Sequence, residues 1–370
     1  MRFPEFSGEW ESKRLDECVT FLDEQRKPIK STERSSESKL YPYYGASGVI
    51  DYIDDYIFDE ELILLSEDGA NILDRNYRVA FIIKGKTWVN NHAHVLKPMK
   101  NVDISYLSEY LESLKYEKYN TGSTMPKLNQ EVCRSIRVWM PQYEEQSKIG
   151  RLLSVINERI ETQKKIIEKY ESLIRGISNK LLYESEGASA CLGDILIERS
   201  ERTKINNQHE VLSSTVKGIF SQREYFSKDI ASENNVGYKI IRLHDVVLSP
   251  QNLWMGNINY NDKFDIGIVS PSYKIFSIAD GYDKRFVAGL LKTHRALYNY
   301  MQVSEQGASI VRRNLNIEAF EQLVFKMPPL YKQQKIGNAI SVLNSRLGVA
   351  NRIKLDLELQ KDWLLCEMFI

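Results

Sequence analysis

The chain has 370 residues, more than one compact domain usually holds, so two or more domains are expected. Its 50 basic and 50 acidic side chains give a net charge of zero, whereas a sequence-indifferent nucleic-acid binder normally has a basic excess. The four scattered cysteines indicate a reducing compartment and disfavour a zinc site, and neither a signal peptide nor a long apolar run is present. We therefore expect a soluble, cytoplasmic protein.

Residues 1–142 read as a β-rich head with a net charge of −4, from 19 basic and 23 acidic side chains. Turn residues separate its strand-like stretches, and a helix is expected around residues 103–119. The stretches are YPYYGASGVIDYI (41–53), FDEELILLSEDGAN (58–71), YRVAFII (77–83) and KTWVNNHAHVL (86–96).

Residues 143–186 predict one long helix. From Ile149, apolar residues recur in alternating steps of four and three, which is the coiled-coil pattern. Pro141 precedes the helix, and two glutamates fall in its first turn, where the helix dipole favours them. The seam is Ile149, Leu153, Ile156, Ile160, Gln163, Ile167, Tyr170, Ile174, Ile177 and Leu181.

Residues 187–329 read as a second β-rich head, with 17 basic and 15 acidic side chains. Strand-like stretches include YKIIRLHDVVLSP (238–250) and GIVSPSYKIFSI (267–278), and a helical region is expected around 283–302. Each head also has a loop of small residues before its last strand. These loops are NTGSTMPKLN (120–129) and SEQGASIVRRNLN (304–316).

Residues 330–370 predict a second long helix that repeats the first. MPQYEEQSKIGRLLSVINERI (140–160) and MPPLYKQQKIGNAISVLNSRL (327–347) share 10 of 21 positions without a gap. The seam recurs at the same offset, although Lys354 and Lys361 occupy two of its positions and leave open how tightly the second half closes. An apolar face of this length needs a partner, and for each helix that partner could be another chain. The matching register favours pairing of the two helices with each other, and a two-fold relation between the halves would make them antiparallel.

Residues with catalytic or metal-binding patterns are scarce. Neither a GxxxxGK[ST] phosphate loop nor an Asn/Asp-Pro-Pro-aromatic motif occurs in the sequence. His92 and His94 alternate along a strand, but no cysteine or carboxylate set completes a metal site, so we expect a structural or hydrogen-bonding role for them. The sequence predicts a protein that binds rather than an enzyme.

Two β-rich heads that alternate with two long helices, each begun by P-x-x-x-x-Q-x-K-I, form a specific combination. Over the whole chain it resembles the specificity (S) subunit of type I restriction–modification enzymes. YPYYGASGVIDYI, LLSEDGAN and WVNNHAHVL are similar to one class of that family's target-recognition domains, and GIVSPSYKIFSI is similar to another class. The starts of the two long helices resemble its conserved regions, and the chain ends in WLLCEMFI.

The resemblance implies an α+β fold with target-recognition domains at 1–142 and 187–329 and an antiparallel helix pair at 143–186 and 330–370. Each head would read one half of a bipartite duplex DNA site, and the helices would set the spacer. Two modification subunits would dock on the helices to form an adenine methyltransferase, and restriction subunits would complete an ATP-driven nuclease. S-adenosylmethionine, ATP and Mg²⁺ would belong to those partners, with no cofactor and no catalytic residue in this chain.

Candidate DNA-contacting residues are polar or basic side chains in turns, because these types read base edges. For any single one of them, an ordinary solvated loop residue is the simpler interpretation. They are Tyr44, Ser47, Asn71, Ser123, Thr124 and Lys127 in the first head, and Lys217, Gln251, Asn252, Ser309, Arg312 and Arg313 in the second.

Candidate docking residues for the modification subunits are the polar residues that recur at the start of both helices: Gln146 and Lys148 in the first, Gln333 and Lys335 in the second. The simpler interpretation of these four is helix solvation. A different function also remains open, in which the heads and coiled coil form a scaffold for protein partners without DNA. The zero net charge favours that alternative.

Overall fold

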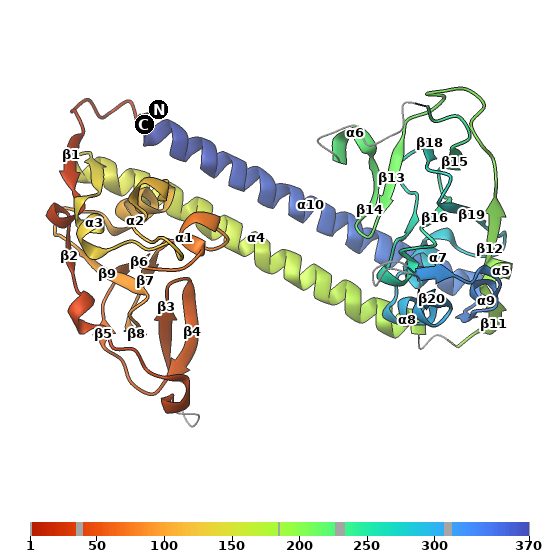
Figure 1. Ribbon diagram of the computed structural model, residues 1–370, viewed down its shortest axis with the longest axis horizontal. Coiled ribbons are helices and arrows are strands. Elements are labelled where there is room, and N and C mark those ends of the chain that lie inside the picture. The colour runs from red at the N-terminus through yellow and green to blue at the C-terminus, as the bar shows by residue number, and fades with distance from the viewer. Residues whose placement is uncertain (1, 35–39, 184–185, 226–233, 307–312, 370) are drawn as a thin grey trace. The chain divides into compact units, whose positions relative to one another are not determined.

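The computed structural model describes residues 2–34, 40–183, 186–225, 234–306 and 313–369. By compactness the chain divides into two units, residues 1–164 with 352–370 and residues 165–351. Each unit contains one head and a part of each long helix (Figure 1). The division between the units therefore falls within the helices and not at their ends.

The two long helices are α4 (Tyr143–Tyr183), with 41 residues, and α10 (Leu330–Met368), with 39. Proline stands two residues before the first helical residue of α4 and immediately before that of α10. Because proline has a helix-compatible φ but no backbone N–H, it suits a helix start and not a helix interior.

A four-stranded antiparallel sheet forms the centre of the first head, in the order β2-β9-β6-β7. All five positions of β6 are buried, which suits its uninterrupted apolar run LILL. The strands are β2 (Val19–Phe21), β6 (Leu62–Ser66), β7 (Ala80–Ile83) and β9 (Ala93–Pro98).

A second sheet in this head has the order β4-β3-β8-β5, and a separate two-stranded ladder joins β1 to β10 just before α4. The tight connection between β3 and β4 uses Gly48, whose φ of +124° disfavours other residues. The strands are β1 (Glu11–Arg14), β3 (Tyr41–Gly45), β4 (Gly48–Ile53), β5 (Phe58–Asp59), β8 (Lys86–Val89) and β10 (Arg137–Met140).

Short helices complete the first head. The longest, α2 (Ile104–Ser113), packs on β6 and β7 and begins at Asp103, whose side chain accepts the Tyr106 N–H and caps the helix. The others are α1 (Asn71–Asp74), α3 (Gln130–Ser135), and the single 3-10 turns η1 (Leu15–Glu17), η2 (Asp23–Gln25), η3 (Ser31–Glu33) and η4 (Glu117–Tyr119).

The second head is built around an antiparallel sheet in the order β12-β19-β16-β17. Three two-stranded ladders, β13–β14, β15–β18 and β20–β21, surround it, and β11–β22 precedes α10. The strands are β11 (Ala188–Cys191), β12 (Leu196–Arg199), β13 (Leu212–Thr215), β14 (Gly218–Ser221), β15 (Lys239–Arg242), β16 (Val246–Leu248), β17 (Ile258–Tyr260), β18 (Ile266–Val269), β19 (Lys274–Ile278), β20 (Ser304–Gln306), β21 (Arg313–Leu315) and β22 (Val324–Met327).

The helices of the second head are again short. α7 and α8 occupy the region where the sequence predicted helix, and α8 packs on η5. The bounds are α5 (Leu192–Ile195), α6 (Gln222–Tyr225), η5 (Leu253–Met255), α7 (Lys284–Leu291), α8 (His294–Gln302) and α9 (Ile317–Glu321).

The two heads repeat one framework, which confirms the predicted internal duplication. Each head begins with a strand (β1 or β11), a short helical turn (η1 or α5) and the first strand of the central sheet (β2 or β12). The last sheet strand then leads to a capped helix (α2 or α7), a shorter helix (α3 or α9) and a closing strand before the long helix. Sheet order also corresponds, with β2-β9-β6-β7 matching β12-β19-β16-β17.

The long helices pack antiparallel within each unit. In the first unit, Leu357 and Leu364 from the second half of α10 share a core with Ile149 and Leu153 from the start of α4. In the second unit, Leu182 near the end of α4 shares a core with residues at the start of α10. The predicted α+β fold with paired antiparallel helices is therefore confirmed. In the described part of the chain, no helix has the length and apolar character needed to cross a membrane.

Candidate nucleic-acid interface

The repeated motif that begins both helices fixes each helix to its own head. The Gln146 side chain is buried, accepts the Asp103 N–H at 2.9 Å and donates to the Pro141 carbonyl at 2.8 Å. Gln333 repeats both contacts, with the Asp283 N–H at 3.0 Å and the Pro328 carbonyl at 2.8 Å. The amides of both glutamines are buried and bonded within the chain, so they join each helix to its head and are not solvated side chains. Their predicted role in docking modification subunits stays a prediction.

The two lysines of the motif are exposed, in contrast. Lys148 pairs with Glu5 and lies 4.5 Å from the centre of the Phe3 ring. Lys335 lies near the Tyr331 ring on the surface of α10. Of the four predicted docking residues, only these two present their side chains at the surface.

Three turns that carry candidates of the first head meet beside the central sheet. The Ser66 hydroxyl donates to the Ala46 carbonyl at 2.6 Å, which ties the β3–β4 turn to the end of β6. The turn after β6 also pairs with the 120–129 loop, through the Gly69 N–H to Pro126 and the Leu128 N–H to Glu67. The sequence alone gave no indication that these turns are neighbours.

Within this group the candidates differ in accessibility. Ser47, Ser123 and Thr124 are exposed. Tyr44 is half-buried beside Phe81. Asn71 is also half-buried and uses its amide oxygen and nitrogen to hold the Tyr77 backbone, at 2.7 and 3.0 Å, so it shapes the turn.

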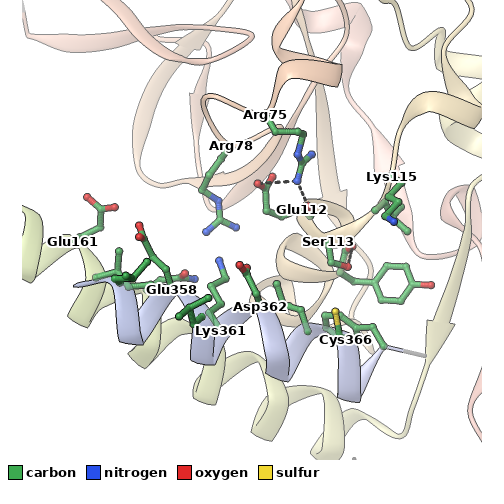
Figure 2. A pocket seen from close by; sticks show the side chains of 18 of the residues that line it. Arg75, Arg78, Glu112, Ser113, Lys115, Glu161, Glu358, Lys361, Asp362 and Cys366 are labelled. Carbon is green, nitrogen blue, oxygen red and sulfur yellow. Dashed lines mark hydrogen bonds and ion pairs between the residues drawn. The ribbon is translucent and has the colours of Figure 1, made fainter. Parts of the chain in front are cut away.

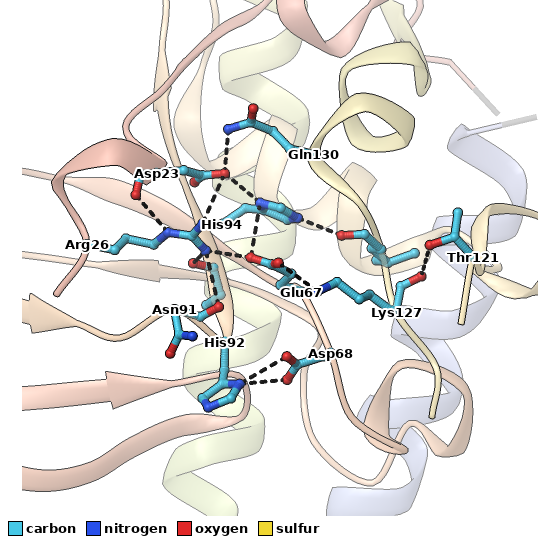
Figure 3. A network of polar contacts seen from close by, with 12 residues as sticks. Asp23, Arg26, Glu67, Asp68, Asn91, His92, His94, Thr121, Lys127 and Gln130 are labelled. Atoms are coloured by element: carbon cyan, nitrogen blue, oxygen red, sulfur yellow. Dashed lines mark hydrogen bonds and ion pairs between the residues drawn. The ribbon is translucent and has the colours of Figure 1, made fainter. Parts of the chain in front are cut away.

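A charged network lies beneath the 120–129 loop (Figure 3). His94 is fully buried, with Nδ1 at 2.7 Å from Asp23 Oδ2 and Nε2 at 2.8 Å from the Leu128 carbonyl. Because both neighbours accept hydrogen bonds, both ring nitrogens must carry protons, and His94 is an imidazolium. Burial by itself would lower the pKa of His94, but its polar neighbours, with the hydrogen bond to Asp23 first among them, outweigh burial and raise the pKa to about 10.

Asp23 balances that charge. Burial would raise its pKa, but the hydrogen bond and charge of His94, with the Val95 N–H and Arg26, lower it. Gln130 of α3 donates to the same carboxylate at 2.7 Å. The buried pair therefore joins η2, β9 and α3 to the end of the candidate loop.

Lys127 stands at the edge of the same network. Its Nζ lies 3.3 Å from Glu67 Oε1, and Arg26 contacts the other oxygen of that carboxylate at 2.6 Å (Figure 3). His92 pairs with Asp68 at 2.9 Å. The hydrogen-bonding role predicted for the two histidines agrees with these contacts, and no group of metal-ligating side chains is found in the described ranges.

In the second head, the structure brings together four candidates around η5. Lys292 donates to the carbonyls of Val216 and Gly256, at 3.5 and 3.0 Å, and so links the β13–β14 turn to the turn after β16. The Arg313 N–H donates to the Gln251 carbonyl at 3.2 Å. Lys217 and Gln251 are exposed, whereas Asn252 and Arg313 are half-buried. Ser309 and Arg312 lie outside the described residues.

The two groups occupy equivalent places in the repeated framework. In each head, the turn after the sheet's central strand, β6 or β16, meets the loop that precedes the shorter helix, α3 or α9. Sequence reasoning selected residues from both segments but missed Asp23, Arg26, Glu67 and Trp254, which hold or flank them. The sequence SEDG places two acidic residues beside a turn glycine, and this pattern could have indicated a role for Glu67.

A cavity of about 1260 Å³ in the first unit lies between the segment after α2 and the end of α10 (Figure 2). Its lining mixes both charges, and Arg75 pairs with Glu112 at 3.1 Å. Beside it, the buried Glu109 pairs with Arg78 and, at 2.9 Å, with Lys361. Burial would raise the pKa of Glu109, but these two cations lower it. Lys361 thus enters the helix seam as part of a buried ion pair.

Residues 7–172 match the family model "Type I restriction modification DNA specificity domain". The specificity subunit S.HindORF215P of Haemophilus influenzae is 32% identical over 149 residues, 40% of this chain and 38% of that protein. The Escherichia coli EcoprrI specificity subunit is 27% identical over 33% of this chain and 29% of its own length. The Methanocaldococcus jannaschii MjaVIII specificity subunit is 24% identical over 66% and 56%. The matches thus span less than two thirds of each relative.

The fold is similar to that of a solved structure along its whole length. The S subunit of the type I restriction–modification system from M. genitalium aligns with a TM-score of 0.70 at 14% identity, over 100% of this chain and 99% of that chain. At this identity the likeness concerns the fold. Together with the family match, it confirms the resemblance that the motifs indicated: this chain is similar to the specificity subunits of type I restriction–modification enzymes.

Proposed function

We propose that this chain is the DNA-recognition subunit of a type I restriction–modification complex. Each head reads one half of a bipartite duplex site, and the chain itself carries out no chemistry. The observation that supports this most is the equivalent grouping of polar and basic side chains in both heads, where a turn after the central sheet strand meets the loop before the shorter helix.

The side chains in these groups suit base readout. Arg, Lys, Asn and Gln recognise base edges in the major groove, and Ser and Thr adapt to several bases. The described members available for such contacts are Ser47, Ser123, Thr124 and Lys127 in the first head, and Lys217, Gln251, Asn252 and Arg313 in the second.

We propose that α4 and α10 set the spacer and bind two modification subunits. Lys148 and Lys335 support this, because they are exposed at matching positions of the repeat. Three exposed apolar residues also follow one face of α10: Leu355, Leu359 and Trp363. Restriction subunits complete the assembly, and S-adenosylmethionine, ATP and Mg²⁺ act in the partner subunits.

The test is to co-express the chain with its modification subunit and to sequence methylated adenines. We expect two short specified blocks with a fixed gap. Lys127→Ala should weaken methylation through one block, and Lys217→Ala through the other. The isolated chain should methylate nothing, and if it does, the non-catalytic assignment is wrong.

The protein-binding scaffold remains the second candidate because the net charge is zero. The scaffold hypothesis predicts that, with modification subunits present, duplex DNA shows no sequence-specific, salt-dependent shift in electrophoretic mobility. A DNA-recognition subunit predicts such a shift, because phosphate contacts release counterions. A shift that is absent at both low and physiological salt would favour the scaffold.

A further inference from the structure

Arg313 in the second head is held by its backbone at the centre of the candidate group. It begins β21, which pairs antiparallel with β20 so that Arg313 lies opposite Gln306. Its N–H also donates to the Gln251 carbonyl at 3.2 Å. Arg313 is thus fixed both to its own ladder and to the turn after β16.

The guanidinium of Arg313 is also held in orientation. Its central carbon lies 5.0 Å from the centre of the Trp254 ring, and Nη1 donates to the Met301 carbonyl at 3.4 Å. An aromatic neighbour at this distance restrains the flat guanidinium group, and a single carbonyl uses few of its five N–H donors. A pre-oriented hydrogen-bonding edge remains.

The two heads differ in whether the basic side chain of the candidate group has an acidic partner. In the first head, Lys127 is neutralised by Glu67, which is itself shared with Arg26. Among the residues that the structure describes, Arg313 forms no ion pair with a carboxylate. A half-buried cation that has no carboxylate partner in the described part of the chain is suited to a ligand that supplies acceptors.

We propose that Arg313 reads a guanine in the half-site of the second head, and that Trp254 is its positioning residue. This inference rests on the proposed DNA-recognition function. Guanine is the base that presents two acceptors, N7 and O6, side by side in the major groove, and arginine binds that pair in a bidentate manner. The nearby amides of Gln251 and Asn252 match the donor and acceptor of adenine instead.

The experiment selects duplexes from a randomised library with the full chain and its modification subunit, and compares variants. Wild type should enrich two blocks, one of which contains a guanine that depends on Arg313. Arg313→Ala and Arg313→Lys should both remove that preference, which we expect to be about 5- to 150-fold, and leave the other block intact. Lysine keeps the charge but lacks the fork of donors. Arg137→Ala, at an exposed arginine of β10 in the first head, is the matched control and should change neither block.

Trp254 provides the second variant. Trp254→Leu should reduce the guanine preference while Arg313 is still present, and Trp254→Phe should retain part of it. If Arg313→Lys keeps the full preference, or if Arg313→Ala weakens all duplexes equally, the residue is a phosphate contact and the inference is wrong. A wild type that enriches no sequence would overturn the proposed function and this inference together. Thermal melting of each variant separates lost recognition from lost folding.

Discussion

The side-chain carbonyl of Gln146 accepts the backbone N–H of Asp103 at 2.9 Å, and this bond joins the start of α4 to the residue that caps α2. Gln333 and Asp283 form the same bond between α10 and α7. The motif that occurs twice in the sequence therefore encodes a joint between head and helix. A joint made of buried hydrogen bonds restricts the angle between each head and the helix that follows it.

Replacement of the joint glutamine should destabilise the head beside it. Gln146→Ala leaves the Asp103 N–H and the Pro141 carbonyl without their buried partner, at a cost of about 1–3 kcal/mol. Faster amide exchange in α2 would report the loss. Lys148→Ala is the control at the exposed position of the same motif, and we expect a change of about 1 kcal/mol or less. If both variants lowered the free energy of unfolding equally, Gln146 would not act as a joint.

The glycine of the motif should tolerate no side chain. A Cβ at Gly150 would lie 2.7 Å from both Asp103 Oδ1 and the Tyr106 nitrogen, so Gly150→Ala must displace α2. Gly176→Ala lies in the same helix with nothing within 4 Å, and we expect it to stabilise α4 by up to about 1 kcal/mol. Chemical unfolding of the full chain should therefore give opposite signs for the two variants. Gly337→Ala and Gly348→Ala provide the same comparison in α10.

Periodicity made the long helices predictable, because a seam of apolar residues follows from local sequence. The central strands were also visible, since runs such as LILL and YKIIRL need burial. Pairings across the fold were not visible. His94 contacts Asp23, which lies 71 residues away, and no local pattern links an aspartate after β2 to a histidine in β9. Docking residues were inferred from repetition alone, and repetition does not distinguish a joint from a surface.

Because of His94, the free energy of unfolding of the first unit should fall as the pH becomes alkaline. Its folded pKa of about 10 lies above the value of about 6.5 expected for an unfolded chain. The stabilisation is therefore fully present below about pH 6.5 and is lost as the pH rises through about 10, with a slope of at most about 1.4 kcal/mol per pH unit. Asp23 acts in the opposite sense, because its lowered pKa gives a contribution that is lost as the pH falls.

Hydrogen exchange of β9 amides at pH 7 and pH 9.5, corrected for intrinsic rates, measures this slope. His94→Gln should remove most of it, because glutamine does not titrate. The amides of β16 in the second head provide an internal control, since His94 belongs to the first unit. An equal slope in wild type and variant would show that another group titrates.

The proposed spacer function predicts a periodic response to helix length. Insertion of one heptad after Gln163 and another after Ala350 keeps the seam in register and lengthens each helix by about 10 Å, or about three base pairs. The half-sites should stay the same and the gap should widen, but three base pairs also turn one half-site away from the face that its head reads. Methylation should therefore be weak.

Three inserted heptads should restore strong methylation. They add about 32 Å, which is close to the 34–36 Å of one DNA turn, so the half-sites return to nearly the same face with nine or ten more base pairs between them. Sequencing of methylated adenines reads both the gap and the half-sites. Insertion into α4 alone leaves the added heptads without a matching seam in α10, so we expect little methylation at any gap. If the gap keeps its original length in the doubly extended chain, the helices do not set the spacer.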